Sequence, residues 1–247
     1  MEKIKVDNLS FSYPSSDKLA LDSVSLSIPE SEFVVLCGKS GCGKSTLLRH
    51  LKKSMSPYGN KFGSVCFDGK EIEEMSDRDA ASKIGYVQQN PDNQLVTDKV
   101  WHELAFGLES LGYSNSVIKR RVAEMASYFG IQTWFRKSVS ELSGGQKQLL
   151  NLASVMAMQP EVLILDEPAS QLDPIAARDF LSTVHRLNRE LGVTIVISEH
   201  RLEEIFPLAD RAIVMDAGRI IANARPSEVA IQLAGNGDDE SVHPMYY

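Results

Sequence analysis

Residues 38–46 read Gly38-Lys39-Ser40-Gly41-Cys42-Gly43-Lys44-Ser45-Thr46, which matches the phosphate-loop pattern G-x-x-x-x-G-K-[ST]. An apolar run at Phe33–Cys37 precedes the pattern and a helical run follows it, as this motif requires. Glycines let the backbone wrap so that successive N–H groups point at an anion, and Lys44 adds a positive charge for the β- and γ-phosphates. The hydroxyl of Ser45 is a ligand that suits Mg²⁺. This stretch therefore predicts a nucleoside triphosphate site between a strand and a helix of an α/β sheet.

A second candidate element is the apolar run Val162–Leu165, which reads as a buried strand and ends in Asp166, Glu167 and Pro168. Adjacent strand residues face opposite ways, so the two acids suit different tasks. We expect Asp166 to hold the Mg²⁺ shell and Glu167 to orient or polarise the attacking water. Taken alone, an acidic strand end fits a solvated turn equally well.

The run Leu142-Ser143-Gly144-Gly145-Gln146 predicts the start of a helix, because Ser143 and Gln146 have the spacing of a capping box. Gly144 and Gly145 have no side chains, so the tip of this helix is open to an approaching γ-phosphate. The phosphate loop precedes this run and the acidic strand follows it. In this motif and in this order the chain resembles the ABC ATPase family, whose defining motif is LSGGQ.

The resemblance implies a fold class: α/β, a P-loop NTPase (RecA-like) core with a mixed sheet and an inserted α-helical subdomain, which is the ABC ATPase cassette. It also implies ATP and Mg²⁺ as cofactors and a second cassette as a partner, in a homodimer or a heterodimer. In such a head-to-tail pair, Ser143, Gly144 and Gly145 of one chain close over ATP that the other chain holds.

Further residues acquire roles through the same resemblance. Tyr13 is similar to the aromatic residue that stacks on adenine, Gln89 to the Q-loop glutamine and His200 to the switch histidine. Ser170–Asp173 resembles the D-loop at the dimer interface. Independently of the family, Asp173-Pro174 fits a helix N-cap followed by the first helical residue.

The candidate residues form three sets. The catalytic set is Lys44, Gln89, Glu167 and His200. The metal set is Ser45, Gln89 and Asp166. The nucleotide-binding set is Tyr13, Gly38, Lys39, Ser40, Gly41, Cys42, Gly43, Lys44, Ser45, Thr46, Ser143, Gly144, Gly145 and Gln146.

The remaining pattern indicates how the chain is organised. Strand-like runs bounded by turn residues lie at Phe33–Cys37, Val162–Leu165, Val193–Ile197 and Arg211–Met215. Residues 90–151 differ because their periodicity is helical, with Trp101, Leu104 and Leu108 on one apolar stripe. We expect a single domain at 1–235, with an α/β core at 1–89 and 152–235 and an inserted helical lobe at 90–151. The polar residues 236–247 are expected to form a flexible tail.

Composition and charge argue against nucleic-acid binding, membrane spanning and secretion. The formal net charge of −7 gives no overall basic footprint for nucleic acid, so no nucleic-acid partner is expected. Apolar runs are far shorter than the roughly 20 residues that cross a bilayer, and the first residues alternate like a strand rather than a secretory signal. The three cysteines lack paired spacing, which favours a reducing compartment. We therefore expect a peripheral protein at the cytoplasmic face of the cell membrane.

One stretch indicates the kind of transporter. Gln89–Leu95, followed by Glu103–Leu108, is similar to the ATPases of energy-coupling-factor importers for vitamins and for cobalt or nickel. This implies an importer motor with two further partners, an integral membrane coupling subunit and a substrate-capture subunit. A docking hypothesis follows, in which Asp92 and Glu103 meet basic residues of the membrane subunit. The alternative, that both charges are merely solvated, stays open. Two alternatives stay open: the motor of an exporter or of lipid extraction, and a soluble ABC ATPase that acts on nucleic acid.

Overall fold

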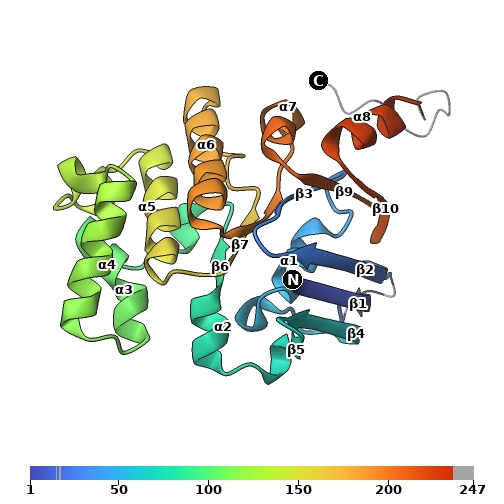
Figure 1. The fold of residues 1–247 in the computed structure, drawn as a ribbon, viewed down its shortest axis with the longest axis horizontal. Helices are drawn as coiled ribbons and strands as arrows, with labels where there is room; N and C mark the ends of the chain where they lie inside the picture. Colours follow the sequence, from blue (N-terminus) through green and yellow to red (C-terminus); the bar gives the residue numbers. More distant parts are fainter. Residues whose placement is uncertain (15, 17, 236–247) are drawn as a thin grey trace.

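The computed structural model describes residues 1–235 except 15 and 17, so the tail expected at 236–247 lies outside the described residues. The described strands form two β-sheets, and the antiparallel one lies at one side of the molecule (Figure 1). The first has the strand order β2-β1-β4-β5 and is antiparallel. Its strands are β1 (Glu2–Ser12), β2 (Leu21–Pro29), β4 (Asn60–Phe67) and β5 (Lys70–Glu71).

The second sheet carries the residues expected at the site. Its strand order is β10-β9-β3-β8-β7-β6, and every neighbouring pair is parallel except β9 with β10. Its strands are β3 (Phe33–Cys37), β6 (Ile84–Val87), β7 (Val162–Asp166), β8 (Thr194–Ser198), β9 (Arg211–Asp216) and β10 (Arg219–Ala224). The four strand-like runs predicted from the sequence correspond to β3, β7, β8 and β9.

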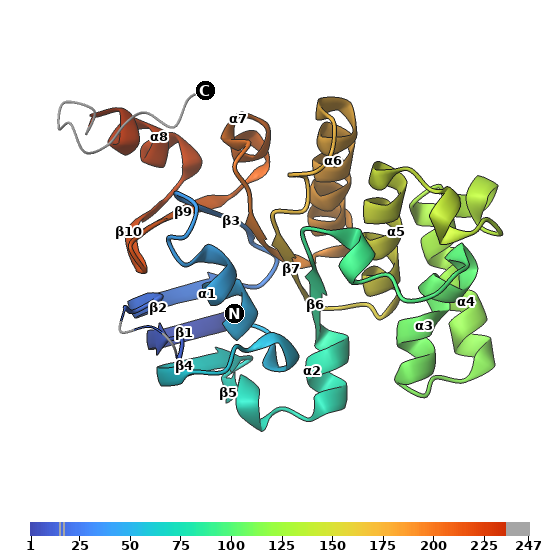
Figure 2. The same ribbon diagram turned by 180° about the vertical axis from the view of Figure 1, so that it is seen from behind.

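Some helices pack against the sheets, and others form a separate group at one end of the long axis (Figures 1 and 2). The helices near the sheets are α1 (Lys44–His50), α2 (Asp77–Lys83), α6 (Pro174–Leu191), α7 (Leu202–Ile205) and α8 (Pro226–Gly235). The helical lobe consists of α3 (Val100–Ser110), α4 (Asn115–Tyr128) and α5 (Gly144–Ala157). The predicted boundary between residues 151 and 152 falls inside α5.

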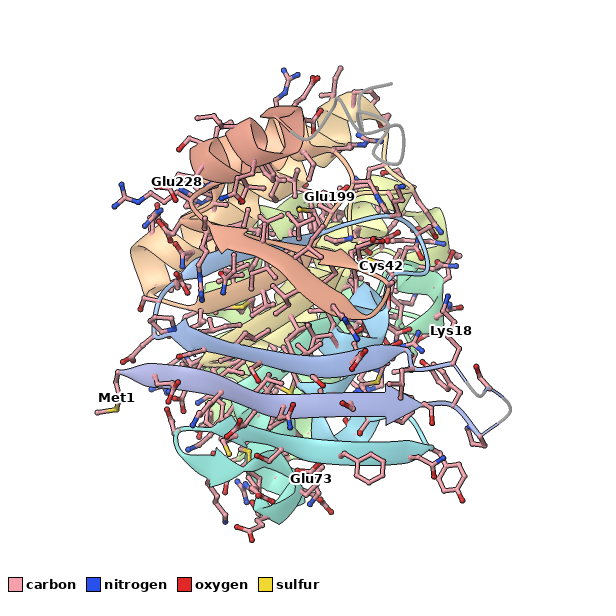
Figure 3. All side chains as sticks on the ribbon, turned by 90° about the vertical axis from the view of Figure 1, so that its right-hand side faces the viewer. Met1, Lys18, Cys42, Glu73, Glu199 and Glu228 are labelled. Atoms are coloured by element: carbon pink, nitrogen blue, oxygen red, sulfur yellow. The ribbon has the colours of Figure 1, made fainter. Side chains whose placement is uncertain are left out.

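The parallel strands are buried on both faces because alternate residues pack into two different cores. Phe33 and Val35 join the core shared with the helical lobe and α6. Val34 and Leu36 join the core between α1 and the antiparallel sheet. This explains why β3 reads as an unbroken apolar run. Figure 3 looks onto the antiparallel sheet, with Glu73 on one side of it and Glu228 of α8 on the other.

Two predictions about α3 and α6 have different outcomes. Asp173 caps α6 through hydrogen bonds from the N–H groups of Ile175 and Ala176, and Pro174 is the first helical residue, as predicted. Trp101 was expected on one apolar stripe with Leu104 and Leu108, but it is not buried as they are. Its side chain is 44% exposed and stacks on His102, because the buried face of α3 is centred on Leu104 and Leu108. Among the described residues, no helix combines the length and apolar character needed to cross a membrane.

The side chain of Lys52 caps the C-terminal end of α2. Its buried ammonium donates to the carbonyl oxygens of Ala80 (2.7 Å), Ala81 (3.3 Å) and Ile84. Burial lowers the pKa of Lys52 from 10.5 to about 8. Above that pH the unfolded chain therefore binds more protons than the folded chain does.

We expect Lys52→Met to lower the free energy of unfolding at pH 7 by about 2 kcal/mol, because buried carbonyls lose a charged donor. The deficit relative to the wild type should grow as pH rises from 8 to 10.5, because only the wild type gains stability from this titration. Urea denaturation at pH 7, 9 and 10 measures both effects. The exposed Lys70→Met serves as the control. Equal stability of the Lys52→Met and Lys70→Met variants would contradict the capping role.

Candidate active site

The phosphate loop joins β3 to α1 and depends on glycine at two positions. Gly38 has φ +144°, and a Cβ there would lie 2.2 Å from the carbonyl oxygen of Met215. Gly43 has φ +110°, and a Cβ there would lie 2.5 Å from the carbonyl oxygen of Ala20. Both positions therefore exclude side chains sterically and conformationally. The loop between them exposes Lys39, Ser40 and Gly41 to solvent.

Lys44 is held inside this loop. Its side chain is 4% exposed, and its ammonium donates to the carbonyl oxygens of Gly38 (2.9 Å) and Lys39 (3.3 Å). The ammonium also lies 3.9 Å from Oε1 of Glu167. The charge is therefore fixed between the phosphate loop and the end of β7.

Three polar side chains converge on Glu167. Oε1 lies 2.8 Å from Nε2 of His200, and Oε2 accepts a hydrogen bond from Nε2 of Gln89 at 3.3 Å. Gln89 also donates to Oγ of Ser170 (3.1 Å). Lys44, Gln89, Glu167 and His200 come from four separate places in the sequence, and the structure brings all four together.

The backbone at Glu167 is in an unusual conformation. Its φ is +48°, in the left-handed region that side chains other than glycine seldom adopt. The Glu167 N–H lies 2.9 Å from Oγ of Ser198 and 3.1 Å from its carbonyl oxygen, which holds this conformation in place. Such strain costs about 1–3 kcal/mol and persists where the surrounding structure fixes it. Here it turns the carboxylate toward Lys44 and His200.

Asp166 ends β7 and is almost fully buried. Its Oδ1 accepts hydrogen bonds from the hydroxyls of Ser45 (2.9 Å) and Ser198 (2.9 Å), and its Oδ2 accepts one from Tyr86 (3.1 Å). Burial and the charge of Asp166 raise the pKa of Tyr86, so its hydroxyl keeps its proton and is the donor. Ser198 and Tyr86 were not among the predicted site residues. The signal that points to them is their place at the ends of the two strands beside β7.

The donor set fits Mg²⁺. Ser45 and Asp166 present a hydroxyl and a carboxylate within 2.9 Å of each other, and Mg²⁺ prefers such oxygen ligands. In the described part of the chain, no group of three or more His, Cys, Asp or Glu side chains forms a metal cage. A magnesium ion here would therefore take its other ligands from nucleotide phosphates and water. Gln89, the third predicted metal residue, donates its amide nitrogen to Glu167 and Ser170, and its role toward the metal stays a prediction.

Tyr13 lies beside the phosphate loop. Its hydroxyl is 3.1 Å from Oγ1 of Thr46, and its ring packs edge-on against Phe11 at 4.9 Å between centroids. The predicted aromatic residue is therefore adjacent to the predicted nucleotide site. Stacking on adenine stays a prediction.

The Leu142–Gln146 run forms the capping box that the sequence predicts. Ser143 Oγ accepts from the Gln146 N–H (3.3 Å), and Gln146 Oε1 accepts from the Ser143 N–H (3.0 Å). A Cβ built on Gly144 meets no atom of the described chain within 4 Å. No hydrogen bond among the described residues joins this run to the phosphate loop. Figures 1 and 2 both place α5 in the lobe and α1 in the core. A single chain thus does not unite these two predicted parts of one site.

The family follows from a comparison with known proteins. The family model described as ABC transporter matches residues 21–170. The chain belongs to the ABC transporter family. This match supports the predicted fold class, the ABC cassette.

Similar individual proteins also belong to the ABC transporter family. A putative ABC transporter ATP-binding protein of Bacillus thuringiensis is 51% identical over 93% of this chain and 42% of its own length. The chain thus spans about two fifths of the length of the first curated relatives it matches. The structure of cbiO1 from Clostridium perfringens, described as part of the ABC transporter complex cbiONQ, has a TM-score of 0.84. It is 31% identical, over 96% of this chain and 95% of its own. A dimeric ATP-binding cassette in a post-hydrolysis state, bound to ADP and Pi, has a TM-score of 0.77 at 24% identity, over 90% and 98% of the two chains.

The structure places Glu103, Asp92 and Cys42 in different surroundings. Glu103 was expected to face a partner, but its side chain is 4% exposed and accepts hydrogen bonds from the N–H groups of Val96 (3.1 Å) and Thr97 (2.8 Å). It closes the loop before α3, so it is not available for docking. Asp92 is exposed and forms an ion pair with Lys147 at 2.6 Å. Burial raises the pKa of the Cys42 thiol, which disfavours the reactive thiolate at neutral pH.

Proposed function

We propose that the cassette binds and hydrolyses ATP as the motor subunit of an ABC-type membrane importer. The observation that carries the proposal is the convergence of Lys44, Gln89 and His200 on one carboxylate, Glu167. Phosphoryl transfer from ATP depends mainly on positioning and on charge stabilisation, and these side chains supply both.

Each residue of the cassette has a distinct task in this scheme. The loop N–H groups and Lys44 bind the phosphates, and Tyr13 stacks on the adenine. Ser45 and Asp166 hold Mg²⁺, which neutralises charge on the β- and γ-phosphates when it is bound. Glu167 orients the attacking water, while His200 and Gln89 hold its two carboxylate oxygens.

The active unit in this proposal is a head-to-tail pair of cassettes. Support comes from the unobstructed tip of α5 at Gly144 and from the phosphate loop, which encloses a nucleotide from one side only. The dimeric ATP-binding cassette of similar fold gives a precedent. Ser143, Gly144, Gly145 and Gln146 of one cassette then complete the site of the other.

A mixing experiment tests the proposed pair. We expect Lys44→Met and Ser143→Arg chains each to be inactive alone, because each spoils both sites of its own dimer. Mixed together, they should regain ATPase activity, since a mixed dimer has one site with an intact Lys44 and an intact Ser143. Phosphate release from the single and mixed variants measures this. Full activity of the Ser143→Arg chain alone, or no recovery in the mixture, would refute the split site.

The importer is proposed to be of the energy-coupling-factor type, for a vitamin or a transition-metal ion. The similarity to cbiO1, a part of a multi-subunit ABC transporter complex, supports this type. An integral membrane coupling subunit and a substrate-capture subunit are the proposed partners, with the cassette on the cytoplasmic face of the membrane. Val96 and Trp101 are exposed apolar residues just after the Q-loop, and such residues suit a docking surface.

We expect Trp101→Glu to weaken assembly with the membrane subunit by about 10-fold or more, because the loss of a Trp side chain at the centre of an interface often has an effect of this size. ATP binding by the isolated cassette should not change. Co-purification with the membrane subunit that accompanies the wild-type chain measures assembly. Ile231→Glu is the matched control, because Ile231 is also exposed but lies on α8. Equal losses in both variants would contradict a specific docking surface at α3.

A further inference from the structure

The carboxylate of Asp166 lies between two strands that each supply a hydroxyl. In the parallel sheet β7 is flanked by β6 and β8. Asp166 is paired with Ser198 across β7 and β8, and Tyr86 of β6 is paired with Ile164 of β7. Strand register, rather than closeness in sequence, brings these three side chains together.

The hydrogen bonds fix both oxygens of the carboxylate. Tyr86 donates to Oδ2 at 3.1 Å, and Ser198 donates to Oδ1 at 2.9 Å. Oδ1 also accepts from Ser45 at 2.9 Å. Tyr86 and Ser198 are both buried, so water does not compete for these bonds. A carboxylate held at both oxygens cannot turn about its Cβ–Cγ bond without losing charge-assisted hydrogen bonds.

We propose that Tyr86 and Ser198 are positioning residues for the magnesium ion: their hydroxyls hold Asp166 with Oδ1 facing Ser45. This inference rests on the proposed function, since it assumes that Mg²⁺ enters with the nucleotide at Ser45 and Asp166. Groups that orient a metal ligand without touching the metal often determine metal affinity.

Tyr86 gives a cleaner test than Ser198. The Ser198 hydroxyl also lies 2.9 Å from the Glu167 N–H, so its removal disturbs two acidic residues at once. Tyr86→Phe keeps the ring and removes only the hydroxyl that faces Asp166. Tyr128→Phe is a matched control, because the Tyr128 hydroxyl also donates to a carboxylate, that of Glu190 (2.9 Å), but does so between α4 and α6.

The experiment measures the binding of a fluorescent ATP analogue to the full chain, first in EDTA and then at increasing Mg²⁺. For Tyr86→Phe we expect unchanged affinity in EDTA, whereas the Mg²⁺ concentration that gives half of the affinity gain should rise about 10-fold. Tyr128→Phe should match the wild type in both conditions. Half-activating Mg²⁺ for ATP hydrolysis should shift in parallel.

An unchanged Mg²⁺ requirement in Tyr86→Phe, or an equal loss of affinity in EDTA, would overturn the inference. If Tyr86→Phe does not fold, as judged by thermal melting, Ser198→Ala and the hydroxyl-retaining Ser198→Thr are measured instead. In that case the inference predicts that Ser198→Ala needs more Mg²⁺ than the wild type, whereas Ser198→Thr does not. A wild-type chain whose nucleotide affinity ignores Mg²⁺ would overturn the proposed function as well, so the two failures are distinguishable.

Discussion

Replacing Glu167 with glutamine should leave ATP binding intact and lower ATP turnover by about 100-fold or more, the usual effect of removing a general base. The substitution preserves shape and the hydrogen bonds of the backbone. It removes the negative charge that faces Lys44 at 3.9 Å and His200 at 2.8 Å. Phosphate release gives the turnover, and equilibrium binding of a fluorescent ATP analogue gives the affinity.

The control for this variant is Glu30→Gln, an exposed carboxylate after β2. It should behave as the wild type in both assays. Near-normal hydrolysis by Glu167→Gln would refute the assigned role of Glu167. A loss of nucleotide binding equal to the loss of turnover would make Glu167 a structural residue instead.

The second large effect is expected from Lys44→Met, which removes the buried ammonium but keeps most of the side-chain stem. Nucleotide affinity should fall by about 10- to 100-fold, since a charged hydrogen bond contributes about 1.5–3 kcal/mol. Turnover should fall with it. Titration with the same ATP analogue measures the affinity.

Lys70→Met, on the exposed strand β5, controls for the loss of one positive charge. If both lysine variants bind ATP equally well, general electrostatic attraction rather than the phosphate loop holds the nucleotide. Thermal melting of the two variants separates a binding defect from unfolding, because the Lys44 ammonium also bonds to two loop carbonyls.

The sequence is enough to predict four strands of the larger sheet: β3, β7, β8 and β9. Strands buried on both faces must be apolar throughout, so β3 and β7 are recognisable as short unbroken runs. The phosphate loop can also be predicted from the sequence, because local geometry requires glycine at positions 38 and 43. These features depend on residues that are neighbours in the chain.

Features that depend on distant segments were harder to predict. The roles of Gln89 and His200 were expected only through the family resemblance, and their meeting at Glu167 needs the folded sheet. Tyr86 was missed because its partner, Asp166, lies on another strand. Glu103 was assigned to a docking surface because nothing local in the sequence shows that the loop before α3 folds back and donates two N–H groups to its carboxylate.

The ion pair between Lys44 and Glu167 has a consequence for the order of events during ATP turnover. Within one chain the two groups serve as counter-ions for each other at 3.9 Å. An arriving polyphosphate competes with Glu167 for the same cation, because both ligands are anionic. We therefore expect nucleotide binding to weaken the contact between the Glu167 carboxylate and Lys44. In the proposed mechanism, the arrival of the nucleotide thus prepares Glu167 to act on the attacking water.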